Sequence, residues 1–71
     1  MDIHAVLSAN IRKFRQRKGW SQERLAEESG LHRTYVSGVE RGTRNPTVEI
    51  VGKLAKALGV RVAELFKEPS E

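Results

Sequence analysis

Glycines divide the 71-residue chain into five segments, and within these segments the apolar residues recur at helical spacing. In the first segment the apolar positions are four, four and three residues apart, at Ile3, Leu7, Ile11 and Phe14. Such spacing is typical of one face of a helix. Glycine commonly ends a helix, and we expect helix ends at Gly19, Gly30, Gly42 and Gly59. No stretch alternates as a strand would, so the sequence predicts an all-α fold, a compact five-helix bundle.

A length of 71 residues allows one domain at most, since domains usually contain about 100–200 residues. We expect residues 1–67 to form this domain and residues 68–71 to be a flexible tail. The chain has no cysteine, and its two histidines are far apart, so no metal or other cofactor is expected. The longest apolar run has three residues, whereas a membrane span needs about 20 and a signal peptide about 7–15. We therefore expect a cytoplasmic protein with no membrane partner and, having one domain, no small-molecule ligand.

The chain is moderately basic, because 13 lysines and arginines against 9 acidic residues give a net charge of +4. No acid occurs between Ile3 and Gln22, and five cations fall within seven positions of this stretch, at Arg12, Lys13, Arg15, Arg17 and Lys18. This charge allows nucleic acid or an anionic membrane as partner, and a solvated helix face is the alternative. A membrane is the weaker choice, because the core needs the apolar stripe of this helix.

The second and third segments predict a pair of short helices. Ser21 is a good N-cap for the first of them. A three-residue connection, Gly30–His32, leads to a third helix that we expect from Arg33 to Arg41. A short glycine-containing turn between two short helices is typical of a helix-turn-helix, with its core here at about residues 22–41, although many helical hairpins share this pattern.

Three motifs give the chain a family resemblance. Ser21-Gln22 opens the second helix, Glu40-Arg41-Gly42 closes the third, and Arg44-Asn45-Pro46 follows. With these motifs, and with a similarity that continues to Phe66, the chain resembles the Cro/phage-repressor (XRE) type of helix-turn-helix transcriptional regulator, which has a lambda-repressor-like DNA-binding domain. Within this family the run Arg33–Arg41 is most similar to the small controller proteins of restriction–modification systems. The resemblance implies that a homodimer binds operator DNA, with the third helix in the major groove.

The outward face of the third helix carries the expected base contacts. At about 100° per residue, Val36, Val39 and Glu40 point to one side and the small or polar residues to the other. Arg33 can donate two hydrogen bonds to a guanine, and a solvated arginine is the alternative. Glycine at position 38 would let the backbone approach DNA closely, or would let a symmetry-related copy pack there. We expect base contacts from Arg33, Thr34, Ser37 and Gly38.

Phosphate contacts are expected around this helix. The free N–H groups at the start of the second helix suit a phosphate, with simple capping by Ser21 as the alternative. Tyr35 can place its hydroxyl on a phosphate or bury its ring against Trp20, and Arg44 can reach the DNA backbone or stay solvated. His32 stands where the family has a capping residue, and its ring can face a phosphate instead. The expected contacts to the DNA backbone are Ser21, Gln22, His32, Tyr35, Arg41, Arg44 and Asn45.

An inward carboxylate and a terminal apolar pair are expected to have structural roles. Glu40 lies beside apolar residues and needs a partner, and the resemblance matches Arg15 to the buried arginine that forms this ion pair in the family. Leu65 and Phe66 lie near the end of a chain with little core, and an exposed apolar patch there would be an interface. Because this end forms the dimer in the family, we expect Leu65 and Phe66 in a dimer interface, with burial in the monomer core as the alternative.

The leading interpretation is a sequence-specific transcriptional regulator that binds a pseudo-palindromic operator in double-stranded DNA as a homodimer. Control by its own concentration fits autoregulation, and a restriction–modification controller is the narrower possibility. The alternative is a protein-interaction module, such as an antitoxin or the partner of another regulator, but Arg33, Arg41 and Arg44 argue against it. No nucleophile–base pair and no glycine-rich phosphate loop is visible, so an enzyme is not expected.

Overall fold

The helices are those that the sequence predicts. The computed structural model describes residues 2–68, and over this range it has no strand and five helices: α1 (Ile3–Arg17), α2 (Gln22–Ser29), α3 (Arg33–Arg41), α4 (Val48–Leu58) and α5 (Val62–Leu65). The all-α, five-helix prediction is confirmed. The predicted tail lies outside the described residues except for Glu68. In the described part of the chain, no helix has both the length and the apolar character to span a bilayer.

Polar caps and glycines set the limits of the helices. The Ser21 hydroxyl accepts a hydrogen bond of 3.0 Å from the Arg24 N–H at the start of α2, and the Thr47 hydroxyl caps α4 in the same way. Helices α2 and α3 end at Gly30 and Gly42, whose φ angles of 72° and 80° are left-handed. A side chain strains this backbone conformation. Local sequence therefore determines where these helices begin and end.

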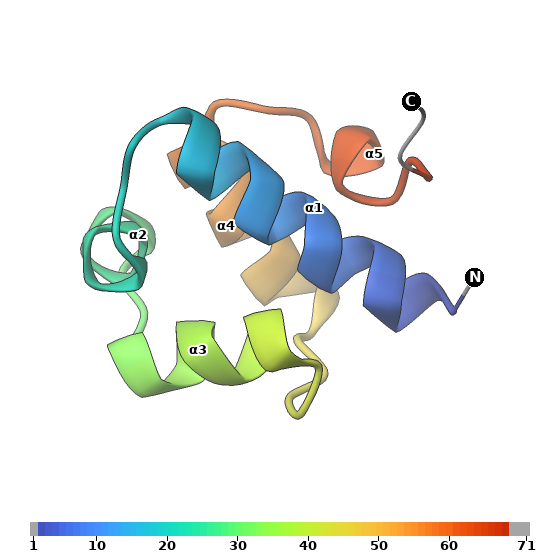
Figure 1. Cartoon of the computed structure of the whole chain (residues 1–71), viewed down its shortest axis with the longest axis horizontal. Helices are drawn as coiled ribbons and strands as arrows, with labels where there is room; N and C mark the ends of the chain where they lie inside the picture. The colour runs from blue at the N-terminus through green and yellow to red at the C-terminus, as the bar shows by residue number, and fades with distance from the viewer. Residues whose placement is uncertain (1, 69–71) are drawn as a thin grey trace.

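The apolar core lies between the first four helices and is closed by α5. Figure 1 shows α1 crossing the molecule, with α4 behind it and with α3 and α5 on opposite sides of it. All five helices contribute buried side chains to one cluster, among them Ile11, Leu25, Val36, Leu54 and Leu65. Because α2 and α3 pack against each other as well as on this core, the helix-turn-helix has a fixed orientation.

Two apolar residues lie elsewhere than the sequence predicts. Ile3 is 56% exposed rather than in the core, because the first turn of α1 projects past the other helices (Figure 1). Leu65 is fully buried in the monomer, so its assignment to a dimer interface is wrong and burial in the core is right. The side-chain amide of Asn10 holds the chain there, since it donates to the backbone carbonyls of Leu65 and Lys67, both at 2.8 Å.

Candidate nucleic-acid interface

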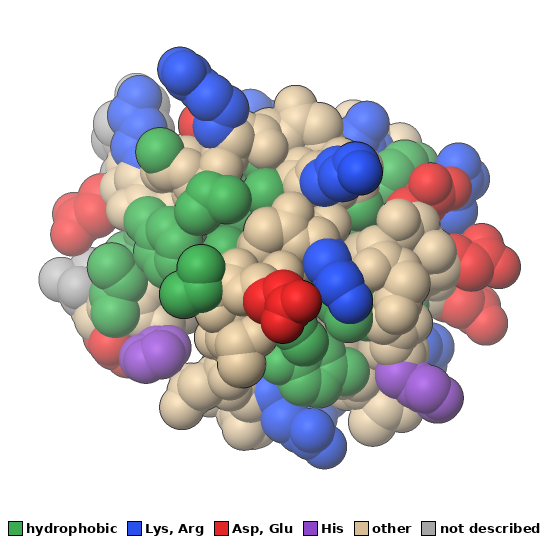
Figure 2. Space-filling view, turned by 180° about the vertical axis from the view of Figure 1, so that it is seen from behind, with side chains coloured by type: hydrophobic (Ala, Val, Ile, Leu, Met, Phe, Trp, Pro, Cys, Tyr) green, Lys and Arg blue, Asp and Glu red, His purple; other side chains and the backbone are tan. Residues whose placement is uncertain are grey.

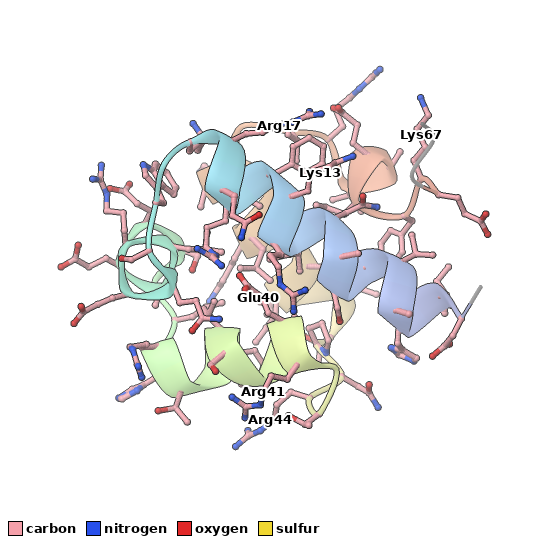
Figure 3. All side chains as sticks on the ribbon, in the orientation of Figure 1. Lys13, Arg17, Glu40, Arg41, Arg44 and Lys67 are labelled. Atoms are coloured by element: carbon pink, nitrogen blue, oxygen red, sulfur yellow. The ribbon has the colours of Figure 1, made fainter. Side chains whose placement is uncertain are left out.

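The outer face of α3 is polar and open to solvent. Arg33, Thr34 and Arg41 are exposed and Ser37 is half-buried, whereas the valines of the same helix are buried. Residues four apart share one face of a helix, and Arg41 Nη1 donates to Ser37 Oγ along this face. Figure 3 shows Arg41 on the side of α3 that points away from α1. The structure therefore presents three of the four predicted base contacts at the surface of one helix.

The inner face of α3 is joined to α1 by a buried ion pair. Arg15 Nε and Nη2 donate to Glu40 Oε2 and Oε1 at 2.7 and 3.0 Å, and Figure 3 shows Glu40 between the two helices. The side chains are 12% and 1% exposed, respectively. Arg12 Nη2 also donates to the backbone carbonyl of Glu40 at 2.9 Å. The predicted Arg15–Glu40 pair is confirmed, and it fixes the position of α3.

The start of α2 is arranged differently from the prediction. The Gln22 side-chain amide donates inward to Glu40 Oε1 at 3.0 Å, while the Ser21 hydroxyl accepts from the Arg24 N–H. The capping alternative for Ser21 is thus confirmed, and both side chains have partners within the protein. The first N–H groups of a helix have no intrahelical partner. The donors that stay open at this end of α2 are therefore backbone N–H groups rather than the Gln22 side chain.

The N-cap side chain of α3, unlike that of α2, is not hydrogen-bonded to the start of its helix. His32 is exposed and occupies the N-cap position of α3, yet its side chain makes no capping hydrogen bond. Its ring is therefore not committed to the helix end, and the expected phosphate contact stays a prediction.

Gly38 does not lie on the open face of α3. It is buried, because the chain reverses at Gly42 and the next two residues return across it. A Cβ built on Gly38 would lie 2.5 Å from Arg44 Cγ and 3.4 Å from Thr43 Oγ1. The prediction that Gly38 contacts bases is therefore wrong. The neighbour for which a Cβ at position 38 leaves no room is a loop of the same chain.

The loop after α3 carries Arg44 onto the flank of that helix. The Arg44 guanidinium lies 5.6 Å from the centroid of the Tyr35 ring, which is a cation–π distance. Figure 3 shows Arg44, like Arg41, on the side of α3 that points away from α1. The next residue, Asn45, is exposed. Tyr35 is half-buried and packs against the core, with an arginine as a neighbour that the sequence did not predict. The expected phosphate contact of Tyr35 and its alternative, burial against Trp20, both stay predictions.

The basic cluster near the end of α1 divides between two sides of the molecule. Arg12 and Arg15 point toward α3, whereas Figure 3 shows Lys13 and Arg17 on the far side of α1. Lys13 and Arg17 lie 5.0 and 5.6 Å from the centroid of the Phe14 ring. The five cations therefore do not form one surface, whereas Figure 3 shows Arg41 and Arg44 on one side of α3.

A second surface, the apolar patch, consists of Ile3, Val48, Val62 and Phe66. These residues are 56, 87, 42 and 36% exposed, and all four line one groove. They come from the starts of α1 and α4 and from α5 and its end, and Figure 2 shows hydrophobic side chains gathered on this face. Phe66 is thus the one predicted interface residue that belongs to the patch. Sequence reasoning missed Val48, although it is an apolar residue off the core-facing stripe of its helix.

Comparison with known proteins identifies the class. Residues 11–65 match the family model described as Helix-turn-helix. This chain therefore belongs to the helix-turn-helix family, and it is a DNA-binding transcriptional regulator rather than an enzyme.

Individual relatives are regulators as well. A hypothetical transcription factor from Neisseria meningitidis serogroup B is 51% identical over 70 residues, which are 99% of this chain and 66% of that protein. Control protein C.SmaI from Serratia marcescens is 51% identical over 66 residues, 93% of this chain and 79% of that protein. The crystal structure of the restriction–modification controller protein C.AhdI from Aeromonas hydrophila has a TM-score of 0.86 at 48% identity, and the match covers 89% of this chain and 96% of that one. The resemblance to XRE regulators and controller proteins is thus confirmed.

Proposed function

We propose that this protein is a cytoplasmic regulator that binds a pseudo-palindromic operator as a homodimer. The observation that carries the proposal is the polar, exposed face of α3 on a helix whose inner face is locked by the Arg15–Glu40 pair. A helix fits the major groove of DNA, which is about 12 Å wide. Side chains that read base edges need a rigid support, and the buried ion pair supplies it.

Base reading is assigned to the outer face of α3. Arg33 in the first turn donates two hydrogen bonds to a guanine, and Thr34 and Ser37 meet neighbouring bases. The phosphates beside the groove contact the groups that surround the helix. At the start of α2 these groups are backbone N–H donors, because the side chains of that turn are engaged within the protein. The other residues that we propose to contact the DNA backbone are His32, Tyr35, Arg41, Arg44 and Asn45.

The apolar patch supports the homodimer. Its four residues belong to distant parts of the sequence, and exposed apolar patches of this kind are typical of protein–protein interfaces. A two-fold axis through the patch would place Phe66 and Val62 of each copy against the other. A dimer of this family type reads two half-sites about 34 Å apart, one turn of DNA, so the operator has two-fold symmetry.

The similarity to control and controller proteins supports a narrower role. C.SmaI is named as a control protein and C.AhdI as a restriction–modification controller. Where dimerisation is coupled to DNA binding, operator occupancy rises steeply with the amount of regulator. We therefore propose autoregulation by protein concentration, in a restriction–modification system.

Selection of bound duplexes from a random library at about 0.15 M salt tests this proposal. Enrichment of a two-fold symmetric site, together with a dimer in sedimentation equilibrium, is the expected result. Arg33→Ala should lose the base preference at one position of each half-site while still binding DNA. Binding without enrichment, lost steeply with salt, would contradict the proposal and would favour a protein-interaction module.

A further inference from the structure

We propose that Gly38 is a positioning residue for Arg44. Gly38 and Tyr35 hold the Arg44 side chain so that its guanidinium binds a DNA phosphate beside the groove occupied by α3. This inference rests on the proposed function, because it states how one contact of that interface is set in place. It gives Gly38 a role away from the bases, through the loop that follows the helix.

One backbone carbonyl anchors this loop. The Gly38 carbonyl oxygen accepts hydrogen bonds from the Thr43 N–H at 2.9 Å, the Arg44 N–H at 3.2 Å and the Thr43 hydroxyl at 3.2 Å. Three donors from two consecutive residues fix the start of the loop against α3. The backbone of Arg44 is therefore held at a defined distance from the helix before its side chain makes any contact.

The stem of Arg44 has room only because residue 38 lacks a Cβ. A Cβ at this position would lie 2.5 Å from Arg44 Cγ and 3.5 Å from Arg44 Cβ, and the first of these distances is far below van der Waals contact. Gly38 is not among the glycines with positive φ, so its backbone conformation does not require glycine. Glycine weakens a helix interior relative to alanine. The residue that the glycine accommodates is Arg44.

The head of Arg44 is supported as well. From its crossing at Gly38 the side chain runs toward Tyr35, whose ring centroid is 5.6 Å from the guanidinium carbon. Tyr35 itself packs against the core and so offers a fixed platform, while Arg44 stays exposed to a ligand. An arginine held at both stem and head loses little side-chain freedom on binding a phosphate. Preorganisation of Arg44 is thus what Gly38 contributes.

A double-mutant cycle on the full chain tests this inference. Affinity for the selected operator is measured at several salt concentrations for Gly38→Ala, Arg44→Ala and the double variant. Each single variant should weaken binding about 10-fold and lower the slope of log affinity against log salt by about one, the signature of one phosphate contact. When Arg44 is already alanine, Cγ is absent, and Gly38→Ala should change affinity by less than about two-fold.

Gly52→Ala is the matched control, since Gly52 also lies inside a helix and a Cβ there meets no atom within 4 Å. It should leave affinity and salt slope unchanged. Unchanged affinity for Gly38→Ala would overturn the inference, and so would an equal loss with and without Arg44. Should Gly38→Ala alone unfold in circular dichroism, refolding of the double variant would support the contact and failure to refold would overturn it. A wild-type chain that binds no operator would instead contradict the proposed function itself.

Discussion

Glu40→Ala should destabilise the domain strongly, because it leaves a buried guanidinium without its carboxylate. The Arg15 side chain is 12% exposed, and two of its hydrogen bonds end on Glu40. Removing one partner of a buried pair typically costs about 3–5 kcal/mol. At roughly 0.05–0.15 kcal/mol per residue, a 71-residue domain has a stability of about 4–11 kcal/mol. The expected loss is therefore about half of the free energy of unfolding of the domain.

The matched control is Glu28→Ala. Glu28 Oε2 lies 2.8 Å from Arg24 Nε, nearly the separation in the buried pair, but the Glu28 side chain is 42% exposed. Exposed pairs of this spacing contribute about 0.3–0.5 kcal/mol. Since 1 kcal/mol shifts the Tm of so small a domain by about 4–8 °C, Glu40→Ala should lower Tm by at least about 12 °C and Glu28→Ala by at most about 4 °C. Circular dichroism at one protein concentration measures both, because dimerisation makes Tm depend on concentration.

A loss for Glu40→Ala no greater than that for Glu28→Ala would refute the reasoning, because burial would then not determine the energy of the pair. The double variant Arg15→Ala/Glu40→Ala adds a second test. If the unpaired charge causes the loss, removing the arginine as well should recover part of the Tm.

Three further predictions concern the dimer, the surface charges and a helix end. Phe66→Ala should weaken self-association in sedimentation equilibrium without loss of helix content, since Phe66 lines the apolar groove; an unchanged dimer would place the interface elsewhere. Replacing Lys13 and Arg17 by glutamine should leave the salt slope of operator binding nearly unchanged, whereas Arg41→Gln should lower it by about one. Equal effects would mean that total charge rather than position controls binding. Gly30→Ala should cost about 1–2 kcal/mol in denaturant unfolding, because its φ of 72° strains any residue with a Cβ and the added methyl gains no contact; unchanged stability would contradict this account.

The helices were predictable because their signals are local. The hydroxyls of Ser21 and Thr47 cap helix starts by accepting from the N–H group three residues downstream, Gly30 and Gly42 end helices, and apolar spacing marks the inner faces. Each of these effects acts within about one helical turn. The Arg15–Glu40 pair is different: it joins α1 to α3, and it was predicted through the resemblance to XRE regulators rather than from spacing.

Contacts between distant segments could not be predicted in this way. Gly38 occupies an outward position of α3 by helical geometry, yet the return of the loop with Arg44 buries it. The apolar patch brings together Ile3, Val48 and Phe66, although these three residues lie on three different segments of the chain. Such contacts depend on how helices cross and where loops return, which no single helical turn encodes.

By itself, the sequence determined that this chain forms five helices and that one of them, α3, has a polar outer face. Only the tertiary structure decided which cations share that face, which apolar side chains remain exposed, and which glycine makes room for Arg44. The physical reason is the distance along the chain over which the two kinds of interaction act. Helix formation depends on hydrogen bonds and caps between near neighbours, whereas the binding surfaces arise from the packing of segments that are far apart in the chain.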